Sequence, residues 1–240
     1  MNRPPVSRAL VLVCAASLLA GCVADSPTAQ GRDVAWLYDV FLAASVAVFL
    51  IVVGLMLWAV VRYRGQPGRN VAMPAQTHGN VALEITWWAL PTLLIIVLAV
   101  LTVGVLGQVD AREEDPGVIV EVRGYQWGWE FAYRDENVVV NGSAADPPTI
   151  RLPIGETVAF VITSADVVHS FNIPTFLIKR DAVPGRENRF DVLIEEAGTY
   201  GGQCGEFCGL LHARQLFEIE AVEREAFDDW LAERRADGAG

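Results

Sequence analysis

A short stretch near the C-terminus, GGQCGEFCGLLHARQ, gathers several side chains that can bind a metal ion. Cys204 and Cys208 stand four residues apart, and His212 follows the second cysteine by the same interval. Thiolate and imidazole together suit copper or zinc. A tight loop with this spacing could wrap around a small metal centre, with His169 as a further ligand from an upstream strand or loop.

The same residues allow two other interpretations. A disulfide between Cys204 and Cys208 is common in an exported protein, but it would leave both histidines without a role. A structural zinc site usually contains a CxxC knuckle, which this stretch lacks. The residues alone favour copper and leave zinc and a disulfide open.

The segment that must position these residues is typical of an all-β sandwich. From residue 117 onward the chain has short runs rich in β-branched and aromatic residues, punctuated by glycine and proline. The runs are 118–133, 157–164, 176–180, 188–194 and 214–222. We place an external domain at 110–222. The segment 223–240 follows as a C-terminal helix and tail, because its apolar residues have helical spacing.

The charge of the chain is acidic and uneven. The net charge is −11, and from Asp110 to the end 25 acidic and 12 basic residues give −13. Nucleic-acid binding is disfavoured, because it needs a basic surface. An acidic domain suits a basic partner that is attracted over a long range, although the charge could equally serve solubility alone.

Two uncharged apolar runs precede this domain and predict a transmembrane hairpin. The spans lie at about 36–61 and 85–109 within the segment 22–109, and each is long enough to cross a bilayer. The linker between them carries Arg62, Arg64 and Arg69 against a single acidic residue. The positive-inside rule therefore puts the linker in the cytoplasm and the C-terminal domain outside.

Residues 1–21 resemble a secretory signal peptide. Two arginines precede a short apolar run that ends in small residues. The ending Leu19-Ala20-Gly21-Cys22 resembles the bacterial lipoprotein box, in which the cysteine is lipidated. An ordinary signal with a chance cysteine is the alternative. Either form of export agrees with an outer location for the C-terminal domain.

Four separate segments resemble subunit II of the haem–copper cytochrome c oxidases. In chain order they are LEITWWALP (83–91), GYQWGWEFAY (124–133), SADVVHSFNIPTFLIKRDAVPGR (164–186) and QCGEFCGLLH (203–212). The resemblance implies two transmembrane helices and a cupredoxin-like domain. It also implies electron entry from cytochrome c, transfer to a haem in subunit I, and oxygen reduction coupled to proton translocation. Subunits I and III would be partners in the membrane of a bacterium.

The resemblance further implies a binuclear copper centre, CuA. Cys204 and Cys208 would bridge the two coppers, and His169 and His212 would each cap one of them. Glu206 would offer its backbone carbonyl to one copper and its carboxylate to a magnesium ion shared with subunit I.

One position departs from the family. Relatives usually carry methionine three residues after the second histidine, where this chain has Gln215, and none of its methionines lies in the external domain. Axial ligands tune the potential of copper sites, and glutamine replaces methionine in some of them. We expect either that the side-chain oxygen of Gln215 is a weak axial ligand or that the copper centre has no axial ligand. An oxygen donor should lower the reduction potential of the centre. The neighbouring Arg214 adds positive charge, which opposes this lowering.

The aromatic segment matches the family's electron-entry position at Trp127. An alternative follows from the alternating pattern, which places Tyr125, Trp127, Trp129 and Phe131 on one side of a strand, packed in the core.

Three acidic residues have two interpretations each. Asp166 and Asp181 suit docking of a basic cytochrome, or they are ordinary turn residues. Glu84 matches the entrance of a proton path into subunit I, or it is a charge favoured by the helix dipole at a helix N-terminus.

Other functions fit less well. The quinol-oxidase branch lacks copper in this subunit, which the two cysteines and two histidines contradict. A membrane-anchored copper chaperone would not need the second span, the aromatic segment or His169. A nitric-oxide-reducing relative with CuA stays open. No CxxCH motif occurs in this sequence, so we expect no fused c-type cytochrome.

Overall fold

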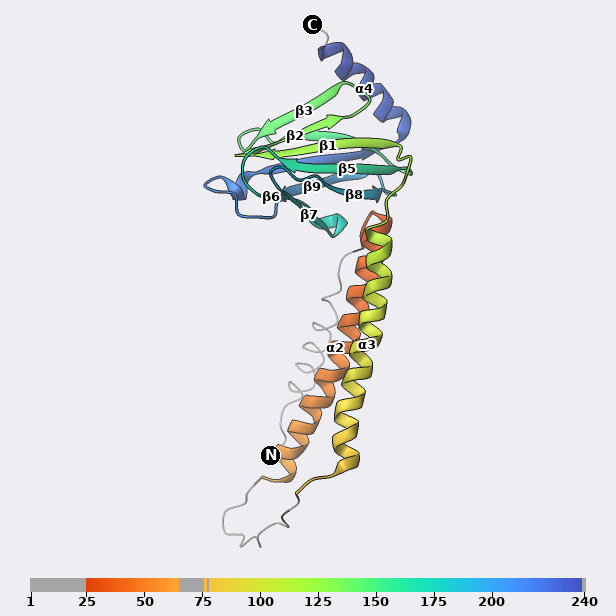
Figure 1. The fold of residues 1–240 in the computed structure, drawn as a ribbon, viewed down its shortest axis with the longest axis vertical. Coiled ribbons are helices and arrows are strands. Elements are labelled where there is room, and N and C mark those ends of the chain that lie inside the picture. Colours follow the sequence, from red (N-terminus) through yellow and green to blue (C-terminus); the bar gives the residue numbers. More distant parts are fainter. Residues whose placement is uncertain (1–24, 65–75, 77, 239–240) are drawn as a thin grey trace, which may run out of the picture. The chain divides into compact units, whose positions relative to one another are not determined.

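The computed structural model describes residues 25–64, 76 and 78–238 of the chain (Figure 1). The predicted signal peptide and Cys22 lie outside the described residues. The chain divides into two compact units. One comprises Leu37–Val105, and the other combines the N-terminal residues through Trp36 with everything from Leu106 onward.

The first unit is built from two long apolar helices, α2 (Ala29–Arg62) and α3 (Val81–Val109). Both are long and apolar enough to cross a membrane, and their side chains are almost entirely exposed. Each helix begins before its predicted span, because helical backbone continues into the more polar residues that flank the apolar run. The side chain of Asn80 accepts a hydrogen bond from the Leu83 amide (3.1 Å) and so caps α3.

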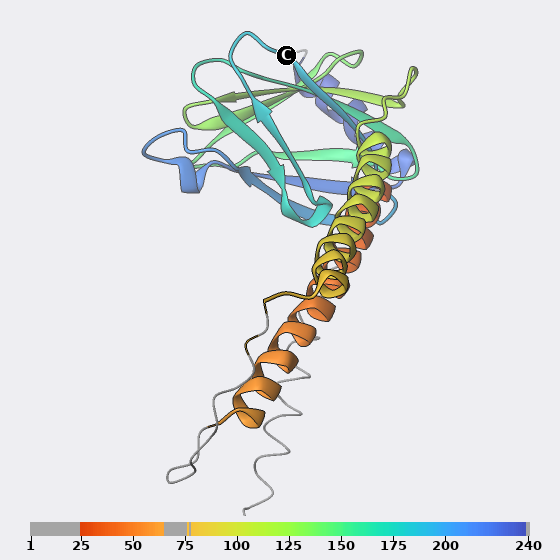
Figure 2. The ribbon, with the colours of Figure 1, turned by 60° about the horizontal axis from the view of Figure 1, so that its bottom comes forward.

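The external domain is a sandwich of two five-stranded sheets, seen from two directions in Figures 1 and 2. The first sheet has the order β3-β2-β1-β5-β8. Its strands are β1 (Val118–Tyr125), β2 (Gly128–Tyr133), β3 (Val138–Ser143), β5 (Thr157–Ser164) and β8 (Asn188–Leu193). The pair β1–β5 is parallel, and the other pairs in this sheet are antiparallel.

The second sheet has the order β4-β10-β9-β6-β7. Its strands are β4 (Thr149–Pro153), β6 (His169–Ile173), β7 (Ile178–Ala182), β9 (Gly198–Cys204) and β10 (Leu216–Val222). The pair β4–β10 is parallel. The loop between β9 and β10 projects from one end of the sandwich in both views. The cupredoxin-like fold class predicted from the sequence is confirmed.

Aromatic side chains fill the space between the sheets. Phe171 of β6 and Phe217 of β10 stack with ring centroids 4.6 Å apart, and both are buried. Trp129 packs edge-on against both of these rings. Aromatic burial on this scale is a major source of stability for a small sandwich.

The run 118–133 is a hairpin, so the prediction that its four alternating aromatics share one face is wrong. β1 ends at Tyr125 and β2 begins at Gly128, with a turn at Gln126 and Trp127. Trp129 is fully buried, whereas Trp127 is only half-buried. The turn interrupts the period of two, so Trp127 belongs to a loop and not to the core face of a strand.

Other boundaries also differ from those expected. The run 176–180 begins in a 3₁₀ turn, η1 (Pro174–Phe176), and β7 starts only at Ile178. The proline-rich stretch 146–156 contains β4, whose proline is its last residue. The C-terminal helix, α4 (Arg224–Gly238), buries Phe227, Trp230 and Leu231 against the sandwich.

The residues before α2 are tied to the sandwich. Thr28 forms a bridge with Ile194 just beyond β8, and the Glu195 amide donates to the Pro27 carbonyl (2.9 Å). Arg32 also forms an ion pair with Glu195. These contacts hold the start of the first helix to the external domain, an attachment that no sequence pattern indicated.

Candidate metal centre

Three predicted ligands meet at one end of the second sheet. His169 is the first residue of β6, Cys204 is the last of β9, and Cys208 lies in the loop that follows. β6 and β9 are paired, with Phe171 opposite Cys204. The pairing brings the two strand ends together, and the donor atoms of the three side chains all lie within 4.8 Å of one another.

Backbone hydrogen bonds close the loop that holds the other candidates. The Cys204 amide donates to the Gln215 carbonyl (2.9 Å) at the loop's far end. Within the loop, a 3₁₀ turn, η2 (His212–Arg214), begins with the second histidine. Nδ1 of His212 lies 3.6 Å from Sγ of Cys208, and Nδ1 of His169 lies 3.9 Å from Sγ of Cys204. Each cysteine therefore has one histidine beside it.

The two sulfurs are 3.8 Å apart, and both cysteines are free and buried. Burial raises the pKa of the Cys204 thiol, but hydrogen bonds with His169 and with nearby backbone groups outweigh it and lower the pKa to about 6. Burial and the nearby charge of Cys204 raise the pKa of Cys208. The surroundings of Cys204 therefore favour its thiolate, which is the form that binds metals.

Glu206 contributes to the site through its backbone. Its carbonyl oxygen lies 3.2 Å from Sγ of Cys204. Its carboxylate forms an ion pair with Lys179 of β7, which also lies 3.7 Å from Asp181. The backbone carbonyl of Glu206 therefore lies beside a cysteine sulfur, whereas its carboxylate lies at the surface beside Lys179.

Asp166 is held at the site, and its partners were not expected. Its Oδ1 lies 2.9 Å from Nε2 of His169, and the same oxygen accepts the Val167 amide (2.6 Å). Oδ2 accepts the Gln126 amide (2.7 Å). The carboxylate therefore orients the buried His169 ring through Nε2, the nitrogen opposite the one that faces Cys204. Asp181 is exposed and makes only the longer contact with Lys179 among the ion pairs of the described residues.

Gln215 is completely buried at the centre of this arrangement. Its Oε1 lies 3.0 Å from Sγ of Cys208 and 3.0 Å from Nδ1 of His169. Its Nε2 donates to the carbonyls of Tyr125 (3.2 Å) and Gly128 (2.9 Å). The structure brings this residue together with both cysteines and the upstream histidine.

Trp127 lies against the loop between β9 and β10, which carries the candidate metal ligands and is called the metal-binding loop below. Its Nε1 donates to the carbonyl of Cys208 (3.3 Å), and Nε2 of Gln126 donates to the same oxygen (2.7 Å). Gln126 was not predicted as a site residue. Its place in the sequence beside the aromatic position was the only available signal.

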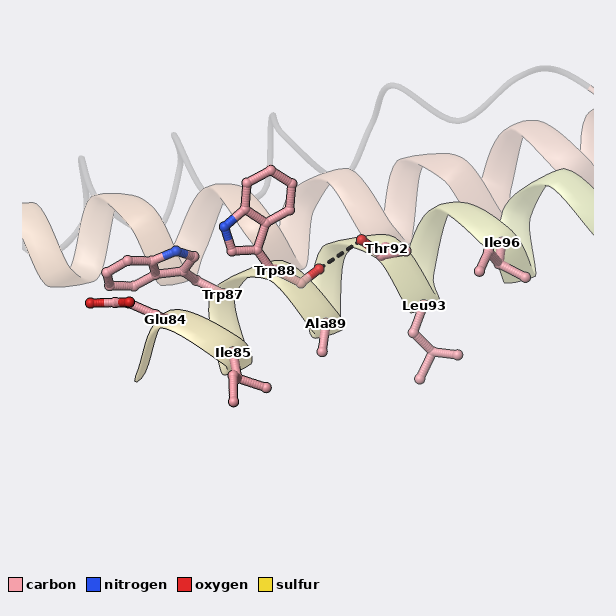
Figure 3. Close-up of a pocket in the computed structure, with 8 residues that line it drawn as sticks. All are labelled: Glu84, Ile85, Trp87, Trp88, Ala89, Thr92, Leu93 and Ile96. Atoms are coloured by element: carbon pink, nitrogen blue, oxygen red, sulfur yellow. Dashed lines mark hydrogen bonds between the residues drawn. The ribbon is translucent and has the colours of Figure 1, made fainter. Parts of the chain in front are cut away.

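Glu84 belongs to the other unit. It is exposed in the first turn of α3, within an open hollow that Trp87, Trp88 and Ile96 also line. Figure 3 shows its carboxylate beside the ring of Trp87 at the start of the helix. This position is compatible with a proton-path entrance and with a simple helix N-terminal charge.

The donor set suits copper. Two thiols and the imidazole of His169 meet at one buried point, and the partly buried His212 lies beside the Cys208 sulfur. A carbonyl oxygen and an amide oxygen lie beside the two sulfurs. Soft sulfur with imidazole is the combination that binds copper, and the hydrogen bond from His169 to a carboxylate is the usual support for a metal-bound histidine. The fold and the site together define a membrane-anchored protein with a cupredoxin-like copper domain.

Comparisons with known proteins identify the family. Residues 16–105 match the family described as Cytochrome C oxidase subunit II, transmembrane domain, and residues 118–222 match the periplasmic domain of the same subunit. The chain is 34% identical over 212 residues to a probable cytochrome c oxidase subunit 2 of Rickettsia bellii, covering 82% of this chain and 77% of that protein. The chain therefore belongs to the cytochrome c oxidase subunit II family.

Two further similarities were found. The cytochrome c oxidase subunit 2 of Alkalihalophilus pseudofirmus is 32% identical over 237 residues, covering 94% of this chain and 67% of that protein. The crystal structure of the periplasmic domain of subunit II from Bradyrhizobium japonicum is 28% identical, with a TM-score of 0.48, and covers 51% of this chain and 96% of that one.

Membership of this family establishes the general role of the chain. It is the electron-entry subunit of a haem–copper oxidase, a membrane complex that catalyses an oxidoreduction. Two helices anchor it, and its C-terminal domain lies on the outer side of the membrane. The relatives do not favour the nitric-oxide-reducing alternative.

Proposed function

We propose that the external domain holds a binuclear copper centre, ligated by Cys204, Cys208, His169 and His212. The supporting observation is the pairing of each sulfur with one imidazole nitrogen around two sulfurs 3.8 Å apart. When bound, this centre would accept one electron at a time and release it again. The carbonyl of Glu206 and the amide oxygen of Gln215 are the weaker ligands of the proposal.

The chain's own residues would prepare the site for fast electron transfer. Both cysteines and His169 are buried, so water has little access to the donors. Asp166 fixes the ring of His169, and the β6–β9 pairing fixes the backbone of Cys204. Donors that are held in place need little rearrangement when the charge of the centre changes, which is how a protein supports rapid electron transfer.

Trp127 is the proposed entry point for electrons from a cytochrome c. It is half-buried, and its indole donates a hydrogen bond to the backbone carbonyl of Cys208, whose side chain is a proposed copper ligand. The acidic charge of the external domain would attract a basic cytochrome. We assign Asp181 as a candidate docking residue because it is exposed. Asp166 has a positioning role, in addition to any part in docking.

The remaining assignments follow from the family. Glu206 would turn its carboxylate to a magnesium ion at the interface with subunit I. The magnesium ion would have to displace Lys179, which forms an ion pair with this carboxylate. Glu84 would serve proton entry. Subunit III would complete the complex, residues 1–21 would be removed as a signal peptide, and Cys22 would carry lipid.

Electron paramagnetic resonance of the full-length chain, loaded with copper in detergent, tests the proposal. Two coppers that share one unpaired electron give a seven-line hyperfine pattern, and metal analysis should find two coppers per chain. A four-line mononuclear signal, or failure to retain copper, would overturn the binuclear assignment. A Cys204→Ser variant serves as the control that removes one proposed bridging sulfur.

A further inference from the structure

The side-chain amide of Gln215 has a defined orientation in the protein. Its nitrogen faces two backbone carbonyls, those of Tyr125 and Gly128, and a carbonyl can only accept a hydrogen bond. The nitrogen must therefore occupy that side, and the oxygen must face Cys208 and His169. The hydrogen-bonding network thus decides which end of the amide points toward the metal-binding side chains.

The two carbonyls flank the turn that carries Trp127. Tyr125 is the last residue of β1 and Gly128 is the first of β2. The side chain of Gln215, at the far end of the metal-binding loop, therefore forms hydrogen bonds to both ends of the turn between these strands. The residues that it joins lie 90 and 87 positions away in the sequence.

A second set of contacts joins the same two segments in the opposite direction. Gln126 and Trp127, within the turn, both donate to the carbonyl of Cys208 in the metal-binding loop. A methionine at position 215 has no donor. It would leave these two bonds in place but remove both bonds made by Gln215. The glutamine therefore adds an attachment that the family's usual residue at this position cannot make.

We propose that Gln215 is a positioning residue for the Trp127 turn as well as the source of an oxygen donor for the metal. A single buried amide would couple the two ends of the electron-entry route, its nitrogen holding the turn and its oxygen facing the copper. The electron-transfer significance rests on the proposed function of Trp127. The two hydrogen bonds from Nε2 of Gln215 to the carbonyls of Tyr125 and Gly128, called the clamp below, are a property of the metal-free protein.

The clamp can first be measured without any substitution. In full-length, metal-free protein with ¹⁵N-labelled glutamine, the side-chain amide protons of Gln215 should exchange with solvent more slowly than those of the exposed Gln203, by about tenfold or more for two buried hydrogen bonds. Equal exchange at the two side chains would refute the clamp.

Substitution tests the effect on the turn. We expect Gln215→Met to accelerate backbone amide exchange in the peptide that covers residues 124–129 by about fivefold or more. Gln203→Met makes the same chemical change at an exposed position of β9 and should leave this peptide unchanged. Unaltered exchange in Gln215→Met would refute the positioning role. Because both measurements use metal-free protein, their failure would leave the copper assignment intact, and failure of copper binding would leave the clamp intact.

Discussion

Replacement of Asp166 by asparagine should weaken copper binding. The carboxylate serves three partners: Oδ1 faces His169 and the Val167 amide, and Oδ2 accepts the Gln126 amide. Asparagine has one oxygen. If that oxygen takes the place of Oδ1, the new amide nitrogen faces the Gln126 N–H, donor against donor; if it takes the other place, the support of His169 is lost. The variant cannot satisfy both sides.

The size of the effect follows from these contacts. A hydrogen bond to a charged group contributes about 1.5–3 kcal/mol, and loss of a residue that supports a metal ligand typically costs about 10- to 100-fold in metal affinity. The side chain of Asp166 is 33% exposed, so solvent screens part of the interaction. We therefore expect a loss at the lower end, about tenfold.

Competition with a copper chelator, using the full-length chain, measures this affinity. Asp181→Asn is the matched control, because it removes the same charge from an exposed carboxylate that is 3.7 Å from Lys179. If both aspartates served only in docking, both variants would raise the KM for cytochrome c and neither would change copper affinity. Equal copper affinity in Asp166→Asn and Asp181→Asn would refute the positioning role of Asp166.

Three further predictions concern the same domain. Gln215→Met should raise the reduction potential of the copper centre, because sulfur favours Cu(I) more than an amide oxygen does; an unchanged potential in a redox titration would rule out an axial role. Trp127→Phe removes the hydrogen bond to Cys208 and should slow reduction by cytochrome c in stopped-flow experiments; an unaltered rate would exclude Trp127 as the entry point. Phe171→Ala should lower the free energy of unfolding by about 3–5 kcal/mol in denaturant titrations, since the ring is fully buried and stacked on Phe217; a loss under about 1 kcal/mol would contradict the packing described.

Much of the architecture could be predicted from the sequence. The transmembrane helices follow from uncharged apolar runs that are long enough to cross a bilayer, and the β-sandwich follows from short β-rich runs between glycines and prolines. The candidate metal ligands were chosen from their types and spacing. Four of them, Cys204, Cys208, His169 and His212, are close together because strand pairing and a closed loop bring them to one end of a sheet.

The features that escaped prediction depend on contacts between distant segments. Asp166 bonds to the Gln126 amide 40 residues away, and Gln215 reaches Tyr125 across 90 residues. Neither bond follows from periodicity or from local spacing. The turn at Trp127 escaped for another reason: aromatic residues continue the alternating pattern through it, so the pattern alone resembles one uninterrupted strand.

Electrons should enter the oxidase through the copper site of this subunit. The most direct test mixes the oxidised complex with less than one equivalent of reduced cytochrome c and freezes samples at successive times for electron paramagnetic resonance. The copper signal should be lost first and should return as the haem of subunit I becomes reduced. Reduction of the haem while the copper signal stays at full strength would contradict this order.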